Sequence, residues 1–211
     1  RYGSMTADFG RYSPWRLLDG KKVAKGQLEL EVMMRGLMDP ETLLDFFRGF
    51  VAFGGSGGGT SYKIIAQWHQ YRGVMKAVER AVSALTQRKD GKGGVIWFTQ
   101  GSGKSLLALF YVMALRDRPE FKNPTIVLVT DRNDLDGQLF DTFADCWWSV
   151  RATPEQAASR EDLRGKLSSV EAGGVYFTTI NKFAPRPGEN SVSALCDRSN
   201  VVVIADEAHR T

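Results

Sequence analysis

Four short apolar runs, rich in β-branched and aromatic residues, constrain the fold of this chain of 211 residues more than any other feature. They are residues 94–98, 125–130, 175–179 and 201–205. Each run is apolar almost throughout rather than alternating, which is typical of strands buried on both faces of a sheet. Helical patterns lie between the runs, at residues 104–116, at 133–146 and from about residue 160, where Ser159-Arg160-Glu161-Asp162 resembles a helix cap. This alternation predicts an α/β fold with a parallel β-sheet.

The most specific motif stands between the first apolar run and the helix that follows it. It reads Thr99-Gln100-Gly101-Ser102-Gly103-Lys104-Ser105. Glycines let backbone N–H groups turn toward phosphate oxygens, and a helix N-terminus adds partial positive charge. In such a phosphate-binding loop Lys104 reaches the β- and γ-phosphates and the Ser105 hydroxyl ligates Mg²⁺. Phe98 stands where the general pattern has glycine, and a tight turn that binds nothing is the competing interpretation.

A second motif, Asp206-Glu207-Ala208-His209, directly follows the last apolar run. Carboxylates at the carboxyl end of a parallel strand emerge where open α/β sheets bind their ligands. Asp206 is predicted to hold the Mg²⁺ of a nucleotide, and Glu207 to orient and deprotonate the attacking water. Alone, such an acidic pair could be a helix cap on the surface. Together with the phosphate-binding loop it predicts a site for ATP hydrolysis.

The composition of the segment before the first apolar run indicates a boundary between two parts of the chain. Residues 54–60 are rich in glycine and serine, which predicts a flexible linker. Before it, Asp39-Pro40 predicts the start of a helix, and after it the apolar spacing predicts a helix over 68–86. The chain ends directly after the acidic motif, so we expect the last domain to be incomplete at its C-terminus.

Positive charge is concentrated in one short stretch. Residues 61–92 hold seven Lys and Arg against two Asp and Glu, whereas the whole chain has a net charge of +4. This pattern predicts a local contact with a polyanion, and a solvated helix face is the alternative. The apolar runs are too short for a membrane span, and the N-terminus lacks the pattern of a secretion signal. Cys146 and Cys196 form no metal-ligand spacing and are predicted to be core thiols in a reducing cytoplasm.

Taken together, the motifs resemble those of superfamily 2 helicases and translocases, whose motif II is Asp-Glu-x-His. The match is closer to the restriction (motor) subunit of type I restriction–modification enzymes, although that family has His where this chain has Phe98. Further matching segments are Trp68-His69-Gln70-Tyr71 and residues 124–136, 177–183 and 204–210. The resemblance runs from about Arg1 to Thr211.

The resemblance implies roles for individual residues. Gln70 would read adenine, because one amide can satisfy both a donor and an acceptor of the base; a helix-surface Gln is the alternative. Strand-end residues would hold the phosphate backbone of one DNA strand without reading its sequence, with simple capping as the alternative. These are Thr130, Asp131, Arg132, Asn133, Thr178 and Thr179. His209 would couple the nucleotide site to these DNA contacts.

The resemblance also implies a domain order and a function. Residues 61–211 would form the first RecA-like motor domain, truncated after motif II, and residues 1–53 the end of an α/β nuclease-type domain without its catalytic residues. The motor would use ATP and Mg²⁺ to translocate double-stranded DNA in the cytoplasm, together with methylation and specificity subunits. In the complete complex it would cleave DNA that is unmethylated at the recognition site. The segment alone is expected neither to cut DNA nor to hydrolyse ATP efficiently.

Three alternatives to this function stay open. One is a free-standing superfamily 2 helicase or remodeller. Another is a nucleic-acid binding module with a vestigial ATP site, which the presence of Lys104, Ser105, Asp206 and Glu207 disfavours. A small-molecule kinase is the third, and it would need neither the threonines at the strand ends nor the basic stretch.

Overall fold

The structure is a computed structural model of the whole chain, and it describes residues 1–5, 7–19, 22–55, 60–130, 133–183 and 194–206. For residues 133–136 it describes the backbone alone. The chain forms two compact units, Arg1–Glu120 and Phe121–Thr211. None of the described helices is long and apolar enough to cross a membrane.

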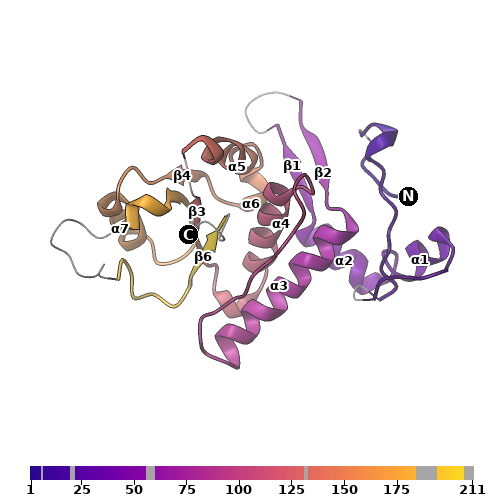
Figure 1. The fold of residues 1–211 in the computed structure, drawn as a ribbon, viewed down its shortest axis with the longest axis horizontal. Coiled ribbons are helices and arrows are strands. Elements are labelled where there is room, and N and C mark those ends of the chain that lie inside the picture. The colour runs from indigo at the N-terminus through magenta and orange to yellow at the C-terminus, as the bar shows by residue number, and fades with distance from the viewer. Residues whose placement is uncertain (6, 20–21, 56–59, 131–132, 184–193, 207–211) are drawn as a thin grey trace. The chain divides into compact units, whose positions relative to one another are not determined.

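The first unit is mostly helical (Figure 1). Its elements are η1 (Phe9–Arg11), α1 (Glu29–Arg35), α2 (Pro40–Gly49), β1 (Val51–Gly54), β2 (Tyr62–Ile65), α3 (Trp68–Thr86) and α4 (Lys104–Arg116), and η2 (Pro119–Phe121) follows at its end. The predicted N-cap of α2 is confirmed, since the Asp39 carboxylate accepts a hydrogen bond of 3.1 Å from the Thr42 backbone N–H. Helix α3 has the predicted bounds, whereas α1 and the two strands were not predicted.

The core of this unit is aromatic and draws on both sides of the predicted linker. Phe50, at the end of α2, lies 4.7 Å from the Tyr71 ring of α3 and 5.9 Å from the Phe110 ring of α4. Trp15 packs edge-on against Phe46 at 5.7 Å. Edge-to-face and tilted ring pairs at these distances are favourable beyond the area that they bury. The N-terminal segment and helices α3 and α4 therefore share one core.

The segment predicted as a linker connects two paired strands. Strands β1 and β2 run antiparallel, with Val51 opposite Ile65 and Gly54 opposite Tyr62. A Cβ on Gly55 would lie 2.7 Å from the Thr60 carbonyl oxygen, so the two sides of the turn approach closely. Glycine suits this place because its φ is +86°, which other residues rarely adopt. Composition alone could not separate a hairpin turn from a linker.

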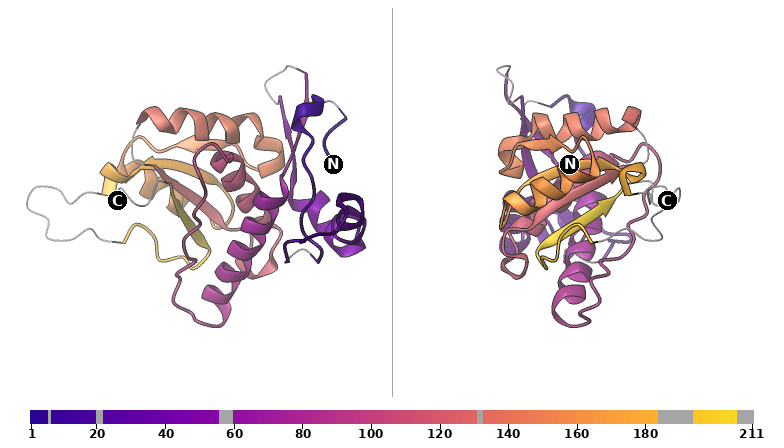
Figure 2. Two further views of the ribbon diagram at one scale, coloured as in Figure 1. Left: turned by 45° about the vertical axis from the view of Figure 1, so that its right-hand side comes forward. Right: turned by 90° about the vertical axis from the view of Figure 1, so that its left-hand side faces the viewer.

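The second unit is a parallel sheet between helices (Figure 2). Its strands lie in the order β4 (Pro154–Gln156), β5 (Val175–Thr179), β3 (Thr125–Thr130) and β6 (Val201–Ala205). The helical elements are α5 (Asn133–Asp145), α6 (Trp147–Val150), α7 (Arg160–Ser169) and η3 (Ile180–Phe183). The predicted strands β3, β5 and β6 and the predicted parallel pairing are confirmed.

Alternate residues of the central strands face different helices. Val127 and Val129 of β3 and Tyr176 of β5 pack in one cluster with Leu163 and Leu167 of α7. On the other face, the Phe177 ring contacts Phe140 and Phe143 of α5 at 5.2 and 5.4 Å. Because successive side chains of a strand point to opposite faces, helices can cover both sides of the sheet. Strands β3 and β5 are buried throughout as predicted, but β6 is partly exposed along the sheet edge.

The expected first strand, residues 94–98, is not formed, and that prediction is wrong for this structure. Val95 is 88% exposed and Trp97 is 85% exposed, so the run is not buried. Side-chain packing on α3 holds the segment instead. A Cβ on Gly73 would lie 2.7 Å from the Phe98 ring, and a Cβ on Gly94 would lie 3.4 Å from the Arg80 Cγ atom.

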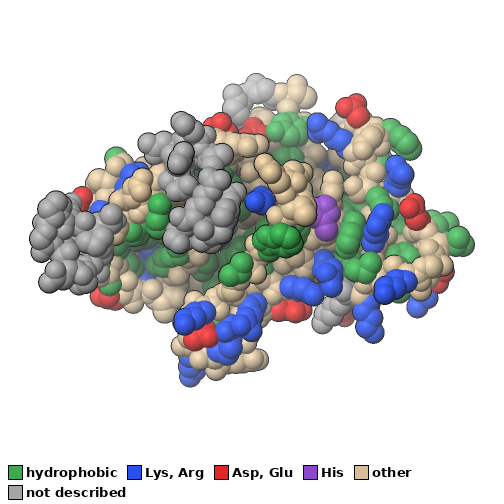
Figure 3. Space-filling model, in the orientation of Figure 1, with side chains coloured by type: hydrophobic (Ala, Val, Ile, Leu, Met, Phe, Trp, Pro, Cys, Tyr) green, Lys and Arg blue, Asp and Glu red, His purple; other side chains and the backbone are tan. Residues whose placement is uncertain are grey.

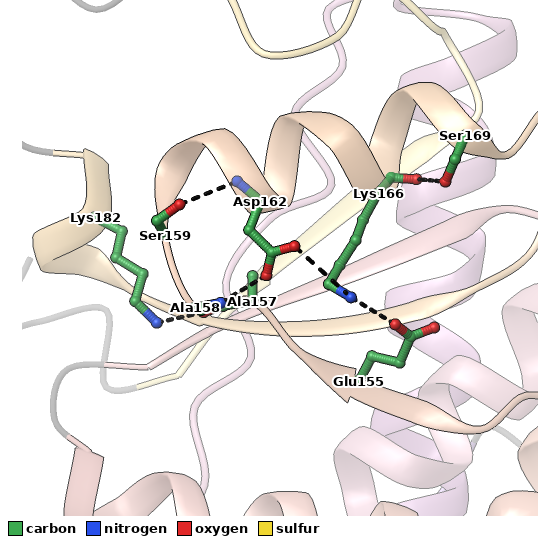
Figure 4. Close-up of polar contacts among 8 residues, drawn as sticks. All are labelled: Glu155, Ala157, Ala158, Ser159, Asp162, Lys166, Ser169 and Lys182. Carbon is green, nitrogen blue, oxygen red and sulfur yellow. Dashed lines mark hydrogen bonds and ion pairs between the residues drawn. The ribbon is translucent and has the colours of Figure 1, made fainter.

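Polar contacts fix the first turn of α7 (Figure 4). As predicted from the sequence, Ser159 is the N-cap, and its hydroxyl oxygen accepts a hydrogen bond of 3.1 Å from the Asp162 backbone N–H. The Asp162 carboxylate accepts one of 2.8 Å from the Ala158 N–H. Lys166 forms an ion pair of 2.6 Å with Glu155 of β4, and Lys182 of η3 donates to the Ala157 carbonyl at 2.5 Å. These contacts join α7, β4 and η3.

Replacing the cap residue is expected to destabilise this unit. Ser159→Ala leaves a helix N–H without its partner, and we expect the free energy of unfolding to fall by about 1 kcal/mol. Chemical denaturation of the chain measures the change. Ser169→Ala is the matched control, because that hydroxyl donates to the Lys166 carbonyl at the far end of the same helix. Equal losses for the two variants would contradict the capping role.

Candidate nucleotide-binding site

The phosphate-loop motif forms a tight turn that leads directly into α4. Both the Ser102 hydroxyl and the Ser102 N–H donate to the Thr99 carbonyl, at 2.6 and 3.3 Å. Gly101 and Gly103 have φ values of +78° and +77°, in the left-handed region that glycine adopts without strain. Gly103 is the N-cap of α4, so the helix begins at Lys104 as the motif requires. The backbone donors of this turn and of the first turn of α4 suit an anionic ligand.

The surroundings of this loop differ from one glycine to the other. Nothing lies within 4 Å of where a Cβ on Gly101 would be, so the chain leaves open space there. Thr99, Gln100 and Lys104 are exposed, and Ser105 is half-buried. Beside Gly103, in contrast, the Gln70 amide nitrogen would lie only 2.7 Å from an added Cβ.

Gln70 supports the loop from α3. Its side chain is only 3% exposed, and its Nε2 donates to the carbonyls of Ser102 and Gly103 at 3.4 and 3.3 Å. Its Oε1 accepts a hydrogen bond of 2.9 Å from the Gln67 N–H and so completes a capping box at the start of α3. Both ends of the amide are therefore engaged within the protein. The contact of Gln70 with adenine stays a prediction.

Two aromatic rings lie on the same side of the loop. His69 Nε2 lies 3.4 Å from the Ser102 carbonyl oxygen, and its ring centroid lies 5.9 Å from that of Phe98. Phe98 also lies against Gly73 of α3. Phe98, which stands where the general motif has glycine, therefore packs against α3 directly before the loop. The capping box and this packing were not foreseen, although Gln67 and Gln70 have the spacing that could have indicated the former.

The close approach of Gln70 to Gly103 predicts a difference between the two glycines of the loop. An alanine at either position is strained by its positive φ, at a cost of about 1–2 kcal/mol. Gly103→Ala must also displace the Gln70 amide, so we expect its free energy of unfolding to fall further than that of Gly101→Ala. Denaturation of both variants, with and without Gln70→Ala, measures this. Equal losses, or a loss for Gly103→Ala that Gln70→Ala does not reduce, would contradict the arrangement.

The second unit brings three other predicted residues to one edge of its sheet. Thr130 and Thr179 are direct neighbours at the carboxyl ends of β3 and β5, and Thr178 is paired with Val129. Asp206 follows β6, and its backbone N–H donates to the Val129 carbonyl at 2.8 Å. Thr130, Thr179 and Asp206 therefore share the edge at which parallel α/β sheets bind ligands.

The threonines at this edge have little accessible surface. Thr130, Thr178 and Thr179 are all buried, and the Thr178 hydroxyl has no hydrogen-bond partner among the described residues. A contact between these hydroxyls and DNA stays a prediction. Four predicted site residues lie outside the described residues, namely Asp131, Arg132, Glu207 and His209. The same holds for the side chain of Asn133.

The two cysteines of this unit differ in environment. Cys146 is buried as predicted, and burial, followed by the nearby Asp145 carboxylate, raises its pKa to about 11. Cys196 is only half-buried, so it is not the core thiol that was predicted. Partial burial opposes its ionisation, but the Arg198 backbone N–H and guanidinium donate to its Sγ at 3.4 Å and lower its pKa.

This contrast predicts different reactivity for the two thiols. The thiolate is the reactive form, so near pH 8 we expect Cys196 to react at least about a hundredfold faster than Cys146 with a disulfide reagent. Cys146→Ala leaves Cys196 alone, and Cys196→Ala leaves Cys146 alone. Stopped-flow reaction of the two variants gives both rates. A faster reaction of Cys146 would contradict the assigned environments.

The glycine-containing loop at the start of α4 and the parallel sheet are consistent with a phosphate-loop ATPase-like domain. Comparison with known families agrees: the SWI2/SNF2 ATPase model matches residues 69–211. The chain belongs to the SWI2/SNF2 ATPase family.

Two relatives that match the whole chain are named as subunits of type I restriction enzymes. The chain is 49% identical, over its whole length, to the type I restriction enzyme HindI endonuclease subunit of Haemophilus influenzae. It is 31% identical, again over its whole length, to the putative type I restriction enzyme MjaIXP endonuclease subunit of Methanocaldococcus jannaschii. It spans 20% and 21% of these two proteins, about a fifth of each. The resemblance to type I restriction subunits seen in the motifs is thus confirmed.

Proposed function

We propose that this chain is part of the ATP-dependent motor of a type I restriction endonuclease subunit, which translocates double-stranded DNA. The observation that carries the proposal is the loop Thr99–Ser105, with two glycines in the left-handed region and Lys104 as the first residue of α4. Its relatives are named restriction endonuclease subunits, and its family is an ATPase family. Cleavage of unmethylated DNA would belong to the complete complex.

The residues of the loop fit a nucleoside triphosphate. Gly101 leaves open space, and Lys104 is exposed beside the backbone donors that begin α4. Lys104 would contact the β- and γ-phosphates, and Ser105 and Asp206 would hold Mg²⁺. When bound, Mg²⁺ supplies positive charge that neutralises the phosphates. Glu207 would orient and deprotonate a water molecule for attack on the γ-phosphate, and Gln70 would contact adenine.

The remaining assignments concern DNA and the complex. The strand-end residues Thr130–Asn133, Thr178 and Thr179 would hold the backbone of one DNA strand, and His209 would couple them to the nucleotide site. Methylation and specificity subunits would be the partners, and the cytoplasm the location. Residues 1–53 would end a nuclease-type domain, residues 54–60 would join it to the motor, and residues 61–211 would begin the first RecA-like domain.

ATP hydrolysis by the full-length subunit, of which this chain would be a part, tests this function. It is measured with and without long duplex DNA, and with and without the methylation and specificity subunits. Turnover that needs both duplex DNA and those subunits supports the proposal. Turnover with any nucleic acid and no partners would indicate a free-standing helicase, and no turnover under any condition would indicate a binding module.

A further inference from the structure

Lysines and arginines gather along α3 and over the loop that follows it (Figure 3). Lys76 and Arg80 are exposed and one helical turn apart, so they lie on the same face of α3, about 6 Å apart along its axis. Lys89 and Lys92 follow in the loop and are also exposed. We call these four residues the α3 basic ridge. None of them forms an ion pair with a carboxylate in the described part of the chain.

A network around Arg88 fixes the loop of the ridge on the end of α3. The Arg88 guanidinium donates to the carbonyls of Arg80 and Lys92, at 3.4 and 2.8 Å, and forms an ion pair of 2.8 Å with Asp90. The Asp90 carboxylate also accepts a hydrogen bond of 2.9 Å from the Lys92 N–H. The loop is therefore folded back against Arg80, which brings its lysines to the same end of the helix.

The charge balance of this surface favours a polyanion. Residues 61–92 contain two acidic residues, Glu79 and Asp90, and Arg88 already pairs with Asp90. Like charges held on one rigid surface repel each other, and bound phosphates remove that repulsion while releasing counterions. An array of exposed Lys and Arg fits a phosphate backbone, which needs no sequence reading.

We propose that the α3 basic ridge binds the phosphate backbone of duplex DNA, at a place separate from the strand-end contacts. This inference rests on the proposed function, because the motor must act on duplex DNA. The ridge would hold the duplex through about four phosphate contacts, and Arg88 and Asp90 would be positioning residues that fix the loop.

Duplex binding by the full-length subunit tests the ridge. It is measured by fluorescence anisotropy across a salt series. The ridge variant carries Lys76→Gln, Arg80→Gln, Lys89→Gln and Lys92→Gln. We expect at least tenfold weaker binding near 0.1 M salt, and a log–log salt slope smaller by about 3.6. The matched control replaces four exposed cations elsewhere in the same unit, Arg11, Lys22, Lys25 and Arg48, and we expect it to bind within about threefold of the unchanged chain.

Two further measurements serve as controls. The first asks whether binding depends on the charge of the ridge or on its fold, and the second asks whether the ridge prefers DNA to other polyanions. A variant with Lys76→Arg, Lys89→Arg and Lys92→Arg keeps the charge, so we expect it to bind like the unchanged chain. Polyglutamate is the second probe, and equally tight, ridge-dependent binding of it would overturn DNA as the partner in favour of an acidic protein surface.

The outcomes also distinguish this inference from the proposed function. If the unchanged chain and the ridge variant bind duplex DNA equally, with the same salt slope, the ridge is overturned and the motor function stands. If the unchanged protein, assembled with the methylation and specificity subunits, binds no duplex DNA and duplex DNA does not stimulate its ATP hydrolysis, both proposals are overturned. Loss of binding in the ridge variant but not in the control supports the ridge.

Discussion

Replacing Lys104 with alanine is expected to lower ATP turnover at least a hundredfold, since removing a single group that stabilises transition-state charge costs about 10²–10³ in kcat. Lys104 begins α4 directly after Gly103, and nothing lies within 4 Å of a Cβ added at Gly101. Its ammonium is the only full positive charge within the motif Thr99–Ser105. Without it, the loop itself would offer the phosphates only backbone dipoles and hydroxyl groups. Phosphate release by the full-length protein, assembled with the methylation and specificity subunits and supplied with duplex DNA, measures the effect.

Lys22→Ala is the control for this variant, because Lys22 is an exposed lysine of the same unit outside the loop. We expect its turnover to match that of the unchanged chain. If Lys104→Ala and Lys22→Ala hydrolyse ATP at the same rate, the loop is not the nucleotide site. Thermal denaturation of both variants separates a loss of activity from a loss of fold.

Replacing Phe50 with alanine is expected to lower the free energy of unfolding by about 3–5 kcal/mol. The Phe50 ring is only 1% exposed and contacts rings from three helices, those of Phe46, Tyr71 and Phe110. Its removal leaves a cavity where the N-terminal segment meets α3 and α4. Denaturant unfolding of the chain measures the loss.

Phe47→Ala is the matched control, since Phe47 is a phenylalanine of the same helix that is 64% exposed. We expect it to change the free energy of unfolding by less than about 0.5 kcal/mol. A small effect of Phe50→Ala would mean that the segments on either side of the predicted linker do not share a core. They would then unfold as separate domains.

Much of the second unit could be predicted because its pattern is local. Strands β3, β5 and β6 are runs of β-branched and apolar residues, and each is bounded by polar or turn residues. The caps at Asp39 and Ser159 were predictable for the same reason, because an N-cap acts within one helical turn. Strand β4 was missed, since Pro154–Gln156 is short and carries no apolar pattern.

The remaining differences depend on contacts between distant residues. Residues 94–98 have the composition of a strand, but Phe98 packs on Gly73 and no strand forms. The hairpin forms because strand Val51–Gly54 pairs with strand Tyr62–Ile65. A run of glycines between two segments does not indicate that the segments pair. Within the site, the loop and the start of α4 follow from the motif, whereas the position of Gln70 depends on how α3 packs.

Movement along DNA is the direct test of a translocating motor. The complete complex, with its methylation and specificity subunits, is loaded on duplexes that carry a labelled third strand at increasing distances from the recognition site. We expect the third strand to be displaced only when ATP is hydrolysed, after a lag that grows in proportion to the distance. We also expect Lys104→Ala to abolish displacement. ATP hydrolysis without displacement, or displacement with no dependence on distance, would contradict a translocating motor.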